Sequence, residues 1–244
     1  MVQLSVNVNK VATLRNARGG ALPDLLDAVR AVLAAGGRAI TIHPREDQRH
    51  ITKEDVEAIA GLLEPLRDEV ELNIEGDPRP DLMDTVLRLQ PHQCTLVPVR
   101  PGEVTSQAGW PSSTPIDTMR QLLLRLKARN IRVSVFVDPD PAAIRWADAL
   151  GAHRVELYTE PYAKAAANGI EAAQASFQNY AACARLAHTF GLGINAGHDI
   201  NLANLQLFSR LPHLDEISIG HALWSRAIFV GLDRVVREYL DILE

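Results

Sequence analysis

Histidine and glutamate side chains stand where short apolar stretches of this chain give way to polar loops. Ile40-Thr41-Ile42 leads into His43, and Leu72-Asn73-Ile74 leads into Glu75. Burial can move the pKa of a carboxyl group towards neutrality, and histidine needs little shift to exchange protons near pH 7. These residue types at these positions favour general acid and base chemistry.

Polar side chains also follow the other apolar stretches of the sequence. A single histidine or aspartate in such a place is more often structural, for example as a turn or cap residue, but several that converge on one rim favour a site. The remaining candidates, in chain order, are Asn7, Asn9, Lys10, Arg45, Thr105, Asp138, Glu156, Thr159, Asn195, Gly197, His198, Gly220 and His221.

Proton transfer fits the titratable candidates better than metal binding or covalent catalysis. These candidates are His43, His50, Glu75 and His198. They lack the HxH and HExxH spacings of common metal sites, so we expect no metal. No nucleophile elbow is present, and Lys10, at the rim, is the nearest candidate for a Schiff base.

Strand-like and helix-like stretches alternate along the whole chain and would position these side chains. Apolar and β-branched runs predict strands over 4–8, 38–43, 69–75, 93–98, 132–137, 154–158, 192–195 and 216–219. Amphipathic spacing predicts helices over 23–35, 53–66, 80–89, 115–128, 141–150, 171–190, 201–210 and 223–243. Eight such units in 244 residues predict a single α/β domain, residues 1–244, folded as a closed (β/α)8 TIM barrel rather than an open sheet.

Two late loops pair glycine with histidine, at Gly197-His198 and Gly220-His221. In such barrels the loops after strands seven and eight commonly hold phosphate through backbone N–H groups and a helix N-terminus. We therefore prefer a phosphorylated ligand to a purely structural turn. The cationic stretch RNARGG at 15–20 is a second candidate anion site, with a solvated basic loop as the equal alternative.

A long loop, 99–114, follows the fourth predicted strand. Its turn residues are Pro101, Gly102, Gly109 and Pro111. Loops of this length inside a compact domain are usually functional. A structured lid that protects a reactive intermediate from water is one possibility for it.

Composition argues against several classes of function. The net charge of −5 disfavours general nucleic-acid or membrane-surface binding, which needs a basic face. Cys94 and Cys183 form no disulfide framework or CxxC motif. No apolar run approaches the ~18 residues of a spanning helix, and residues 1–9 lack the features of a secretory signal. We expect a soluble cytoplasmic protein with no nucleic-acid or membrane partner.

Several stretches of the sequence match the motifs of one enzyme family. The most specific are RNARG at 15–19 and REDQRHI at 45–51. The others are Asn73-Ile74-Glu75, Leu96-Val97-Pro98, Glu103-Val104-Thr105, Asn195-Ala196-Gly197-His198 and Ile219-Gly220-His221-Ala222. Over essentially its whole length the chain resembles the pyridoxine 5'-phosphate synthases.

This resemblance implies a fold, an assembly and a reaction. The fold would be a β/α barrel with additional helices, assembled as dimers into a homo-octamer. The reaction would condense two phosphorylated small molecules, 3-amino-2-oxopropyl phosphate and 1-deoxy-D-xylulose 5-phosphate. It would yield pyridoxine 5'-phosphate, phosphate and water without cofactor or metal, as the last step of de novo vitamin B6 formation.

The resemblance also implies roles for individual residues. The proton acceptors would be His43 and Glu75, and the proton donor His198. The contacts to the amino-ketone phosphate would be Asn7, Gly220, His221 and Arg18, the last reaching from a neighbouring subunit. The contacts to the deoxyxylulose phosphate would be Arg45, His50 and Thr105.

The chain departs from the family pattern at three places on the same rim. Asn9-Lys10 stands in place of Asp-His, Asp199 in place of glycine, and Glu160-Pro161 in place of glycine after Thr159. We include Asn9, Lys10 and Asp199 among the substrate-binding positions. A carboxylate at 199 would repel a phosphate unless a cation such as Lys10 compensates, or unless its side chain points away.

Two alternatives to the synthase stay open. One is a phosphate-binding barrel isomerase or aldolase that acts on a single sugar phosphate. The other is a non-catalytic homologue that binds a B6 vitamer or a sugar phosphate, which the changes at Asn9, Lys10 and Asp199 motivate.

Overall fold

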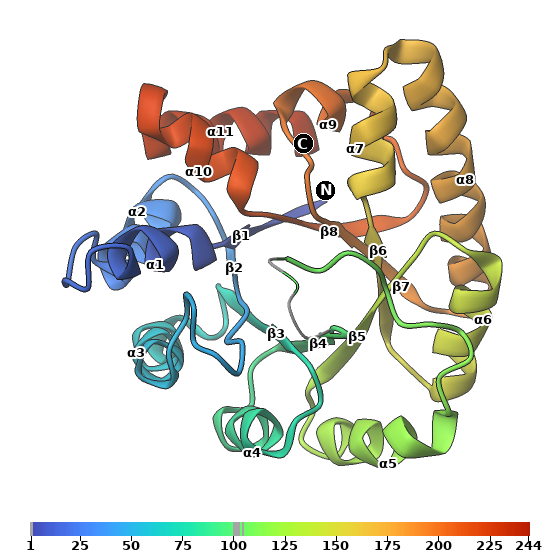
Figure 1. Ribbon diagram of the computed structural model, residues 1–244, viewed down its shortest axis with the longest axis horizontal. Coiled ribbons are helices and arrows are strands. Elements are labelled where there is room, and N and C mark those ends of the chain that lie inside the picture. Colours follow the sequence, from blue (N-terminus) through green and yellow to red (C-terminus); the bar gives the residue numbers. More distant parts are fainter. Residues whose placement is uncertain (1, 100–102, 104) are drawn as a thin grey trace.

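Eight parallel strands close into a barrel in the computed structural model, which describes residues 2–99, 103 and 105–244. Each strand pairs with its neighbours in chain order, and β1 pairs with β8 to close the ring (Figure 1). The strands are β1 (Gln3–Asn7), β2 (Ala39–Ile42), β3 (Glu71–Gly76), β4 (Gln93–Leu96), β5 (Arg132–Val137), β6 (Arg154–Tyr158), β7 (Gly193–Gly197) and β8 (Leu214–Ile219). The predicted (β/α)8 barrel is confirmed.

Helices surround the barrel and connect its strands (Figure 1). Eight of the described helices lie where the sequence predicts them: α2 (Leu25–Ala34), α3 (Lys53–Leu63), α4 (Pro80–Leu89), α5 (Ile116–Lys127), α6 (Pro141–Leu150), α8 (Ile170–Thr189), α9 (Leu202–Phe208) and α11 (Leu232–Leu243). The additional helices are α1 (Asn9–Asn16), α7 (Glu160–Ala167), α10 (His221–Val230) and the 3-10 turn Glu64–Leu66. None of the described helices is long and apolar enough to cross a lipid bilayer.

Three helical segments differ from the sequence-based prediction. The sequence pattern predicts no helix between the strand over 4–8 and the helix over 23–35, but α1 forms there and buries Val11 and Ala12. The polar passage after the sixth strand contains α7, which buries Tyr162. The single helix predicted over 223–243 is divided at Gly231, whose φ of +87° ends α10, because that left-handed conformation favours glycine.

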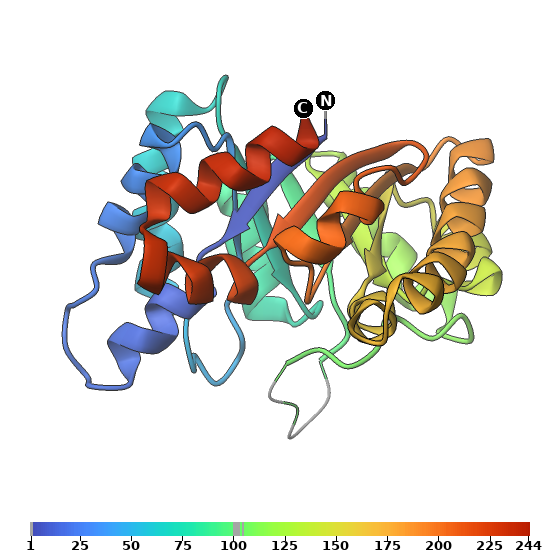
Figure 2. The ribbon, with the colours of Figure 1, turned by 90° about the horizontal axis from the view of Figure 1, so that it is seen from above.

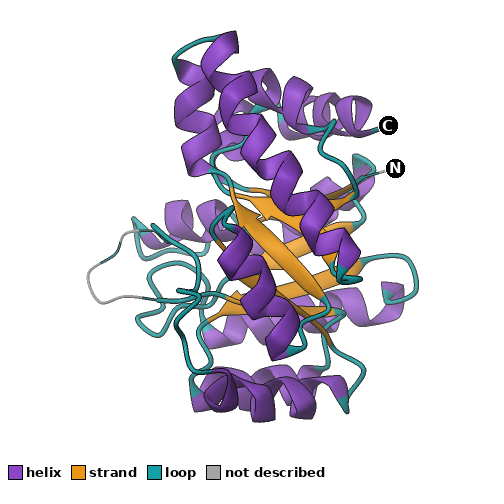
Figure 3. Ribbon diagram, turned by 90° about the vertical axis from the view of Figure 1, so that its right-hand side faces the viewer, coloured by secondary structure: helices purple, strands orange, loops and turns teal. Residues whose placement is uncertain are grey.

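The loops that follow the strands gather at one end of the barrel. Figure 3 shows these loops on the side opposite the two chain ends. In Figure 2 the two termini lie side by side, and the backbone N–H of Val2 donates to the carbonyl of Leu243 at 3.4 Å. Because all eight strands are parallel, the residues after every strand meet at the same rim, where such barrels hold their active sites.

The interior of the barrel is polar, although barrels of this kind usually fill it with aliphatic side chains. Ser5 and Thr41 share a hydroxyl–hydroxyl hydrogen bond of 2.7 Å, and Asn73 donates to Thr41 at 3.3 Å. Thr95 in turn donates to Asn73 at 3.1 Å. The buried aliphatic side chains belong instead to the core between the strands and the helices, as Ile40 does. Successive side chains of each strand point alternately into and out of the barrel, so the polar residues face the interior and the apolar residues face the helices.

Two arginines, at the N-terminal ends of β5 and β6, extend the polar hydrogen-bond network of the interior. Arg132 donates to both carboxylate oxygens of Glu71. Arg154 donates to Asn195 at 2.9 Å and lies 3.3 Å from the buried carboxyl of Glu216. Burial raises the pKa of Glu216 to about 7, and the two arginines oppose that rise. We call these side chains the barrel floor.

Candidate active site

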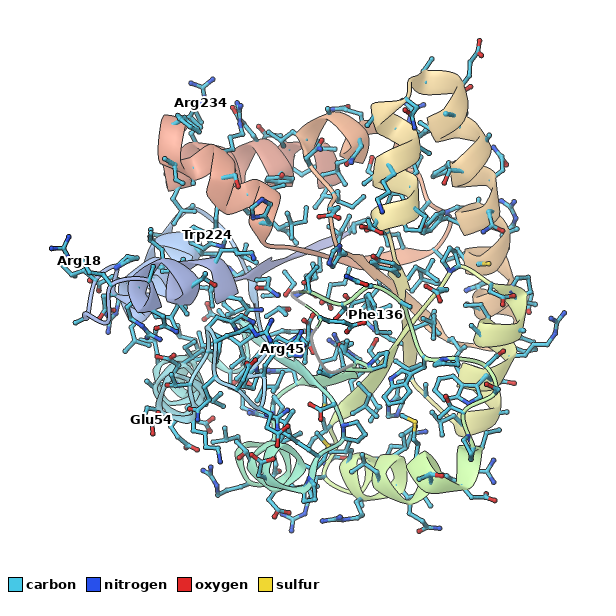
Figure 4. All side chains as sticks on the ribbon, viewed as in Figure 1. Arg18, Arg45, Glu54, Phe136, Trp224 and Arg234 are labelled. Atoms are coloured by element: carbon cyan, nitrogen blue, oxygen red, sulfur yellow. The ribbon has the colours of Figure 1, made fainter. Side chains whose placement is uncertain are left out.

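A cavity of about 310 Å³ opens at the C-terminal rim of the barrel. It brings together the predicted proton-transfer and substrate-binding residues except Arg18. The strand-end candidates Asp138, Thr159, Asn195 and Gly197 are not among its described lining residues. In Figure 4, Arg45 and Phe136 lie over the middle of the ring, whereas Arg18 points outward at its edge. The lining residues are Asn7, Asn9, Lys10, His43, Arg45, His50, Glu75, Val97, Thr105, Ser106, Phe136, Glu156, His198, Asp199, Ser218, Gly220 and His221.

His43 is the first residue after β2, and Pro44 ends that strand because it cannot donate to the ladder. The backbone N–H of His43 donates to the side-chain oxygen of Asn9 at 3.0 Å. Its ring Nδ1 lies 3.8 Å from Oε2 of Glu75, and its buried Nε2 makes no hydrogen bond within the described parts of the chain. Burial, followed by the charges of His50 and Arg45, lowers the pKa of His43 to about 3. The imidazole is therefore neutral at physiological pH.

Glu75 on β3, beside this imidazole, and Glu156 on β6 are buried carboxyl groups that line the cavity. Burial, with a smaller contribution from Glu216, raises the pKa of Glu75 to about 8. Burial and the charge of Glu75 also raise the pKa of Glu156 well above its usual range. A Cβ at Gly197 would lie 2.5 Å from Oε1 of Glu156, so glycine is needed there for the carboxyl to keep its place. Glu75 therefore carries a proton at neutral pH, and burial favours the protonated form of Glu156 as well.

Glu156 is one of the polar strand-end candidates in the sequence, but the sequence assigns it no role. The sequence feature that points to Glu156 is its place between Val155 and Leu157. A charged residue inside an apolar strand faces either solvent or a polar interior. Only the closed barrel decides between these two orientations.

His198 follows β7 and lies across the cavity. Its Nε2 pairs with the hydroxyl of Thr105 at 2.9 Å, and its Nδ1 lies 3.1 Å from Oδ2 of Asp199. The ring stands edge-on to Tyr158, with the ring centroids 5.2 Å apart. His198 and Asp199 both have positive φ, of 86° and 59°.

The loop after β2 supplies the cationic side of the cavity. Arg45 is 5% exposed, and its guanidinium donates to the carbonyl of Glu103 at 3.3 Å. The Nδ1 of His50 accepts the backbone N–H of Ile51 at 2.9 Å. Burial, then the charges of Arg45 and Lys10, lowers the pKa of His50 to about 4. A fixed cation and a neutral histidine thus face the same space.

Arg15 and Asn16, from the cationic stretch 15–20, brace this loop. Arg15 makes a bidentate ion pair with Asp55, with N–O distances of 2.6 and 2.7 Å. Asp55 also forms the capping box of α3 together with Thr52. Asn16 donates to the carbonyl of His50 at 2.8 Å. These contacts favour a structural role for the first two residues of the stretch. Its two glycines line a second hollow of about 550 Å³, away from the first cavity.

The helix α10 begins at the cavity, directly after Gly220. A Cβ at Gly220 would lie 3.2 Å from Cβ of Asn7, so the glycine permits the backbone after β8 to approach the end of β1 closely. The indole N–H of Trp224 donates to the carbonyl of Asn7 at 2.7 Å and fixes the helix to β1. The free N–H groups of this helix end form a suitable place for an anion.

The loop over 99–114 is anchored at its C-terminal part. Gly109 donates to Asp138 at 3.2 Å, and the indole of Trp110 donates to the carbonyl of Leu96 at 2.9 Å. Pro101 and Gly102, two of the turn residues of the expected lid, lie outside the described residues. Asp138 therefore serves as an anchor for the loop.

The described residues contain no group of three or more histidine, cysteine, aspartate or glutamate side chains placed to hold a metal ion. The carboxyls and imidazoles of the cavity are arranged instead as pairs, namely His43 with Glu75 and His198 with Asp199. Paired groups of this kind suit proton exchange.

Comparison with known proteins gives consistent matches over the whole chain. The family model of the pyridoxal phosphate biosynthesis protein PdxJ matches residues 4–244. The chain is 46% identical to a pyridoxine 5'-phosphate synthase of Bacteroides thetaiotaomicron, over 100% of both chains. It is 44% identical to one of Christiangramia forsetii, also over 100% of both. Among solved structures, 3-hexulose-6-phosphate synthase from Salmonella typhimurium has a TM-score of 0.67 at 13% identity, covering 99% of this chain and 98% of that one, which reflects the fold alone.

Proposed function

This chain belongs to the PdxJ family of pyridoxal phosphate biosynthesis proteins, and we propose that it is a pyridoxine 5'-phosphate synthase. It condenses 3-amino-2-oxopropyl phosphate with 1-deoxy-D-xylulose 5-phosphate and releases phosphate and water, in the formation of vitamin B6. The observation that carries the proposal is the meeting of His43, Glu75 and His198 in one cavity. Ring closure needs an imine, enolisation and dehydrations, and each of these steps moves protons.

Glu75 and His43 act as the proton acceptors of this reaction. The neutral imidazole of His43 has a free Nε2, within the described residues, that can take a proton. The raised pKa of Glu75 keeps its carboxyl protonated, and the ammonium of the amino-ketone would favour its ionised form, because an opposite charge nearby lowers a carboxyl pKa. Binding of the substrate thus prepares the base that removes the next proton.

His198 acts as the proton donor to departing oxygen atoms. Its Nε2 is hydrogen-bonded to Thr105 and faces the cavity that also contains Glu75. Glu156 assists from the barrel interior. Burial favours the protonated form of its carboxyl, which can donate a hydrogen bond to an oxygen that gains negative charge and so stabilise a transition state without moving the donor.

Two anion sites accommodate the two phosphates. Arg45 and His50, with Thr105, form the site for the deoxyxylulose phosphate. Asn7, Gly220 and His221, at the N-terminus of α10, form the site for the amino-ketone phosphate. Asn9 and Lys10, the first residues of α1, line the same cavity, where Lys10 adds positive charge near His50. The side chains that lower the pKa of Asp199 are His198, His221 and Lys164, with His198 the largest influence.

The protein assembles as dimers that form a homo-octamer in the cytoplasm. Large apolar side chains are exposed on the loop after α1 and on α10, at Leu22 (77%), Ile228 (75%) and Phe229 (86%). These exposed side chains support burial in an interface between copies of the chain. Cys94 and Cys183 are buried free thiols, which suits a reducing compartment.

Formation of pyridoxine 5'-phosphate from the two phosphorylated substrates tests this function. We expect product from the native protein in the presence of a metal chelator. Glu75→Gln and His198→Ala should each lower kcat by about 10²–10⁴-fold, the range of general acid–base contributions. Glu171→Gln, an exposed glutamate in the first turn of α8, should match the native protein.

Two outcomes would contradict the proposal. Folded native protein that binds pyridoxine 5'-phosphate but forms none would identify a non-catalytic homologue. Conversion of 1-deoxy-D-xylulose 5-phosphate without the amine substrate would identify an isomerase or aldolase.

A further inference from the structure

His198 and Asp199 are neighbours in sequence whose side chains also meet. Nδ1 of His198 lies 3.1 Å from Oδ2 of Asp199, within hydrogen-bond distance but not yet in hydrogen-bond alignment. This Nδ1 is buried and forms no hydrogen bond with the described residues. Hydrogen bonds of this type in an empty active site are often poorly aligned and tighten when substrate binds. Asp199 is therefore placed to be the partner of Nδ1.

The backbone of the pair adopts a conformation that costs free energy. Both residues have positive φ, which side chains other than glycine rarely adopt. The chain nevertheless carries an aspartate, and not a glycine, at 199. Strain of this kind persists at functional sites when neighbouring groups hold it.

Two side chains hold this backbone in place. The hydroxyl of Thr159 donates to the carbonyl of Gly197 at 2.6 Å and also contacts the carbonyl of His198. The amide of Asn204 donates to the carbonyl of Asp199 at 3.2 Å. These contacts are made to the main chain, so they leave the carboxylate of Asp199 available to the imidazole.

The charged groups around Asp199 leave His198 as its principal partner. From α7, Lys164 forms an ion pair with Glu160 at 3.0 Å, and Glu160 also accepts the hydroxyl of Tyr158 on β6. From the first position of α10, His221 lines the same cavity. The close contact with the imidazole of His198 is the largest influence that lowers the pKa of Asp199, ahead of His221 and Lys164. The positive charge of Lys164 is already balanced by Glu160.

We propose that Asp199 is a positioning residue that holds a hydrogen on Nδ1 of His198 and stabilises its imidazolium form. Nε2, beside Thr105, is then the atom that exchanges protons with the substrate. In the donor step Nε2–H gives its proton to the leaving oxygen, and the ring remains neutral with its hydrogen on Nδ1. The tautomer of a histidine is set in this way by the hydrogen bond of its other nitrogen. This inference rests on the proposed function of His198 as the proton donor.

In this arrangement Asp199 has a role other than contact with a phosphate. A carboxylate beside a phosphate weakens binding through repulsion, and its removal would lower KM with little effect on the pH dependence of kcat. A carboxylate paired with an imidazole acts on proton transfer, and its removal changes kcat and its pH profile. The two roles therefore differ in a measurable way.

The test compares Asp199→Asn, Asp199→Gly and the native protein. Asparagine keeps the size of the side chain without its charge, and glycine restores the residue of the family pattern. A carboxylate near a titrating group typically changes its pKa by about one unit or more. We therefore expect the alkaline limb of the kcat profile to move about one unit to lower pH in both variants, with about tenfold lower kcat on that limb. KM for both substrates should change less than about twofold.

A control and a spectroscopic measurement separate positioning from a structural effect. Glu160→Gln removes one negative charge from the same rim without touching the imidazole and should move the limb by less than about 0.3 units. In ¹⁵N-histidine-labelled protein, the neutral ring of His198 should carry its hydrogen on Nδ1 in the native protein and on Nε2 in Asp199→Asn. Asp199→Gly should have an unchanged or higher Tm, because glycine accepts the positive φ.

The outcomes are distinguishable from those of the synthase test. An unchanged alkaline limb and an unchanged tautomer in Asp199→Asn would overturn the inference. An effect on KM alone would identify Asp199 as a substrate contact and would also overturn it. If the native protein forms no product but the tautomer changes in Asp199→Asn, the pairing is supported while the synthase assignment fails.

Discussion

The acid and base of this site are set by burial more than by residue type. Glu75 and His43 lie 3.8 Å apart, yet burial keeps the glutamate protonated and the histidine neutral. An ion pair in the same place would have to overcome the desolvation of two charges. The neutral pair avoids this cost in the empty enzyme and leaves both groups able to change charge when a cationic amine enters.

Because Glu75 is buried in its neutral form, it should make stability depend on pH. Between its ordinary value of 4.5 and its raised value of about 8, the folded protein keeps a proton that the unfolded chain releases. The free energy of unfolding therefore falls as pH rises through this window. The lowered pKa of His43 makes the free energy of unfolding rise with pH, but only between about pH 3 and pH 6.5. Above pH 6.5 the carboxyl effect remains.

Glu75→Gln should remove this dependence. Between pH 6.5 and 8 the native protein should lose about 2 kcal/mol more of its free energy of unfolding than the variant, since each pKa unit corresponds to about 1.4 kcal/mol. Urea denaturation at the two pH values measures the difference. Using the difference cancels the contribution of Glu216, whose pKa is also raised. Parallel losses in the two proteins would show that Glu75 titrates normally.

At the residue scale, the sequence predicted the members of the site but not their electrostatic state. His43, Glu75 and His198 could be placed at the cavity because each follows a recognisable apolar strand. Their pKa shifts depend on burial and on charges that come from distant parts of the sequence, such as Glu216 acting on Glu75. These charged groups come close to one another in space only after the barrel has closed.

At the scale of the elements, the strands were predictable and the short helices were not. The β-branched runs and the helical periodicity gave the eight alternating units, because both signals are local. The helix α1 buries only Val11 and Ala12, which leaves little amphipathic pattern to detect. The polar interior was also missed, since inward and outward faces of a strand cannot be assigned before the barrel is closed. Arg154 and Glu216 were therefore not recognised as a buried pair.

This buried pair on β6 and β8 should contribute to stability rather than to catalysis. Arg154→Leu leaves Glu216 without its nearest cation, and removal of one partner of a buried pair costs about 3 kcal/mol or more. For a chain of this size, that corresponds to a fall in Tm of roughly 6–12 °C. The loss should grow from pH 6 to pH 8, because Glu216 can become neutral at the lower pH. Thermal unfolding and kcat should be measured on the same samples.

Two further variants complete this comparison. Arg154→Leu combined with Glu216→Gln removes both charges and should recover most of the lost stability. Arg30→Leu breaks an exposed ion pair with Asp27 and should change stability by less than about 0.5 kcal/mol. A double variant no more stable than Arg154→Leu alone would show that the arginine acts through packing and not through its charge.

At the scale of the whole molecule, a single chain does not bring Arg18 to the cavity. Arg18 is exposed at the outer end of α1 (Figure 4), in the stretch whose neighbours Arg15 and Asn16 brace the loop of His50. The helix α1 contacts α10, which exposes Ile228 and Phe229. If copies of the chain associate through this region, Arg18 of one copy can reach the cavity of another, as the family resemblance implies.

Complementation between two inactive variants tests whether a site is shared. Arg18→Ala and Glu75→Gln should each be nearly inactive as homo-oligomers, because each removes one component from every site. In a mixed dimer, one cavity receives Glu75 from the first chain and Arg18 from the second. Random pairing on a two-fold interface would make about a quarter of the sites complete, so co-expressed variants should recover a corresponding share of native kcat. If Arg18 serves only its own chain, every cavity lacks one component and the mixture stays inactive. Phe229→Ser should abolish the recovery together with the dimer, as measured by light scattering, because it removes an 86% exposed aromatic ring from the contact.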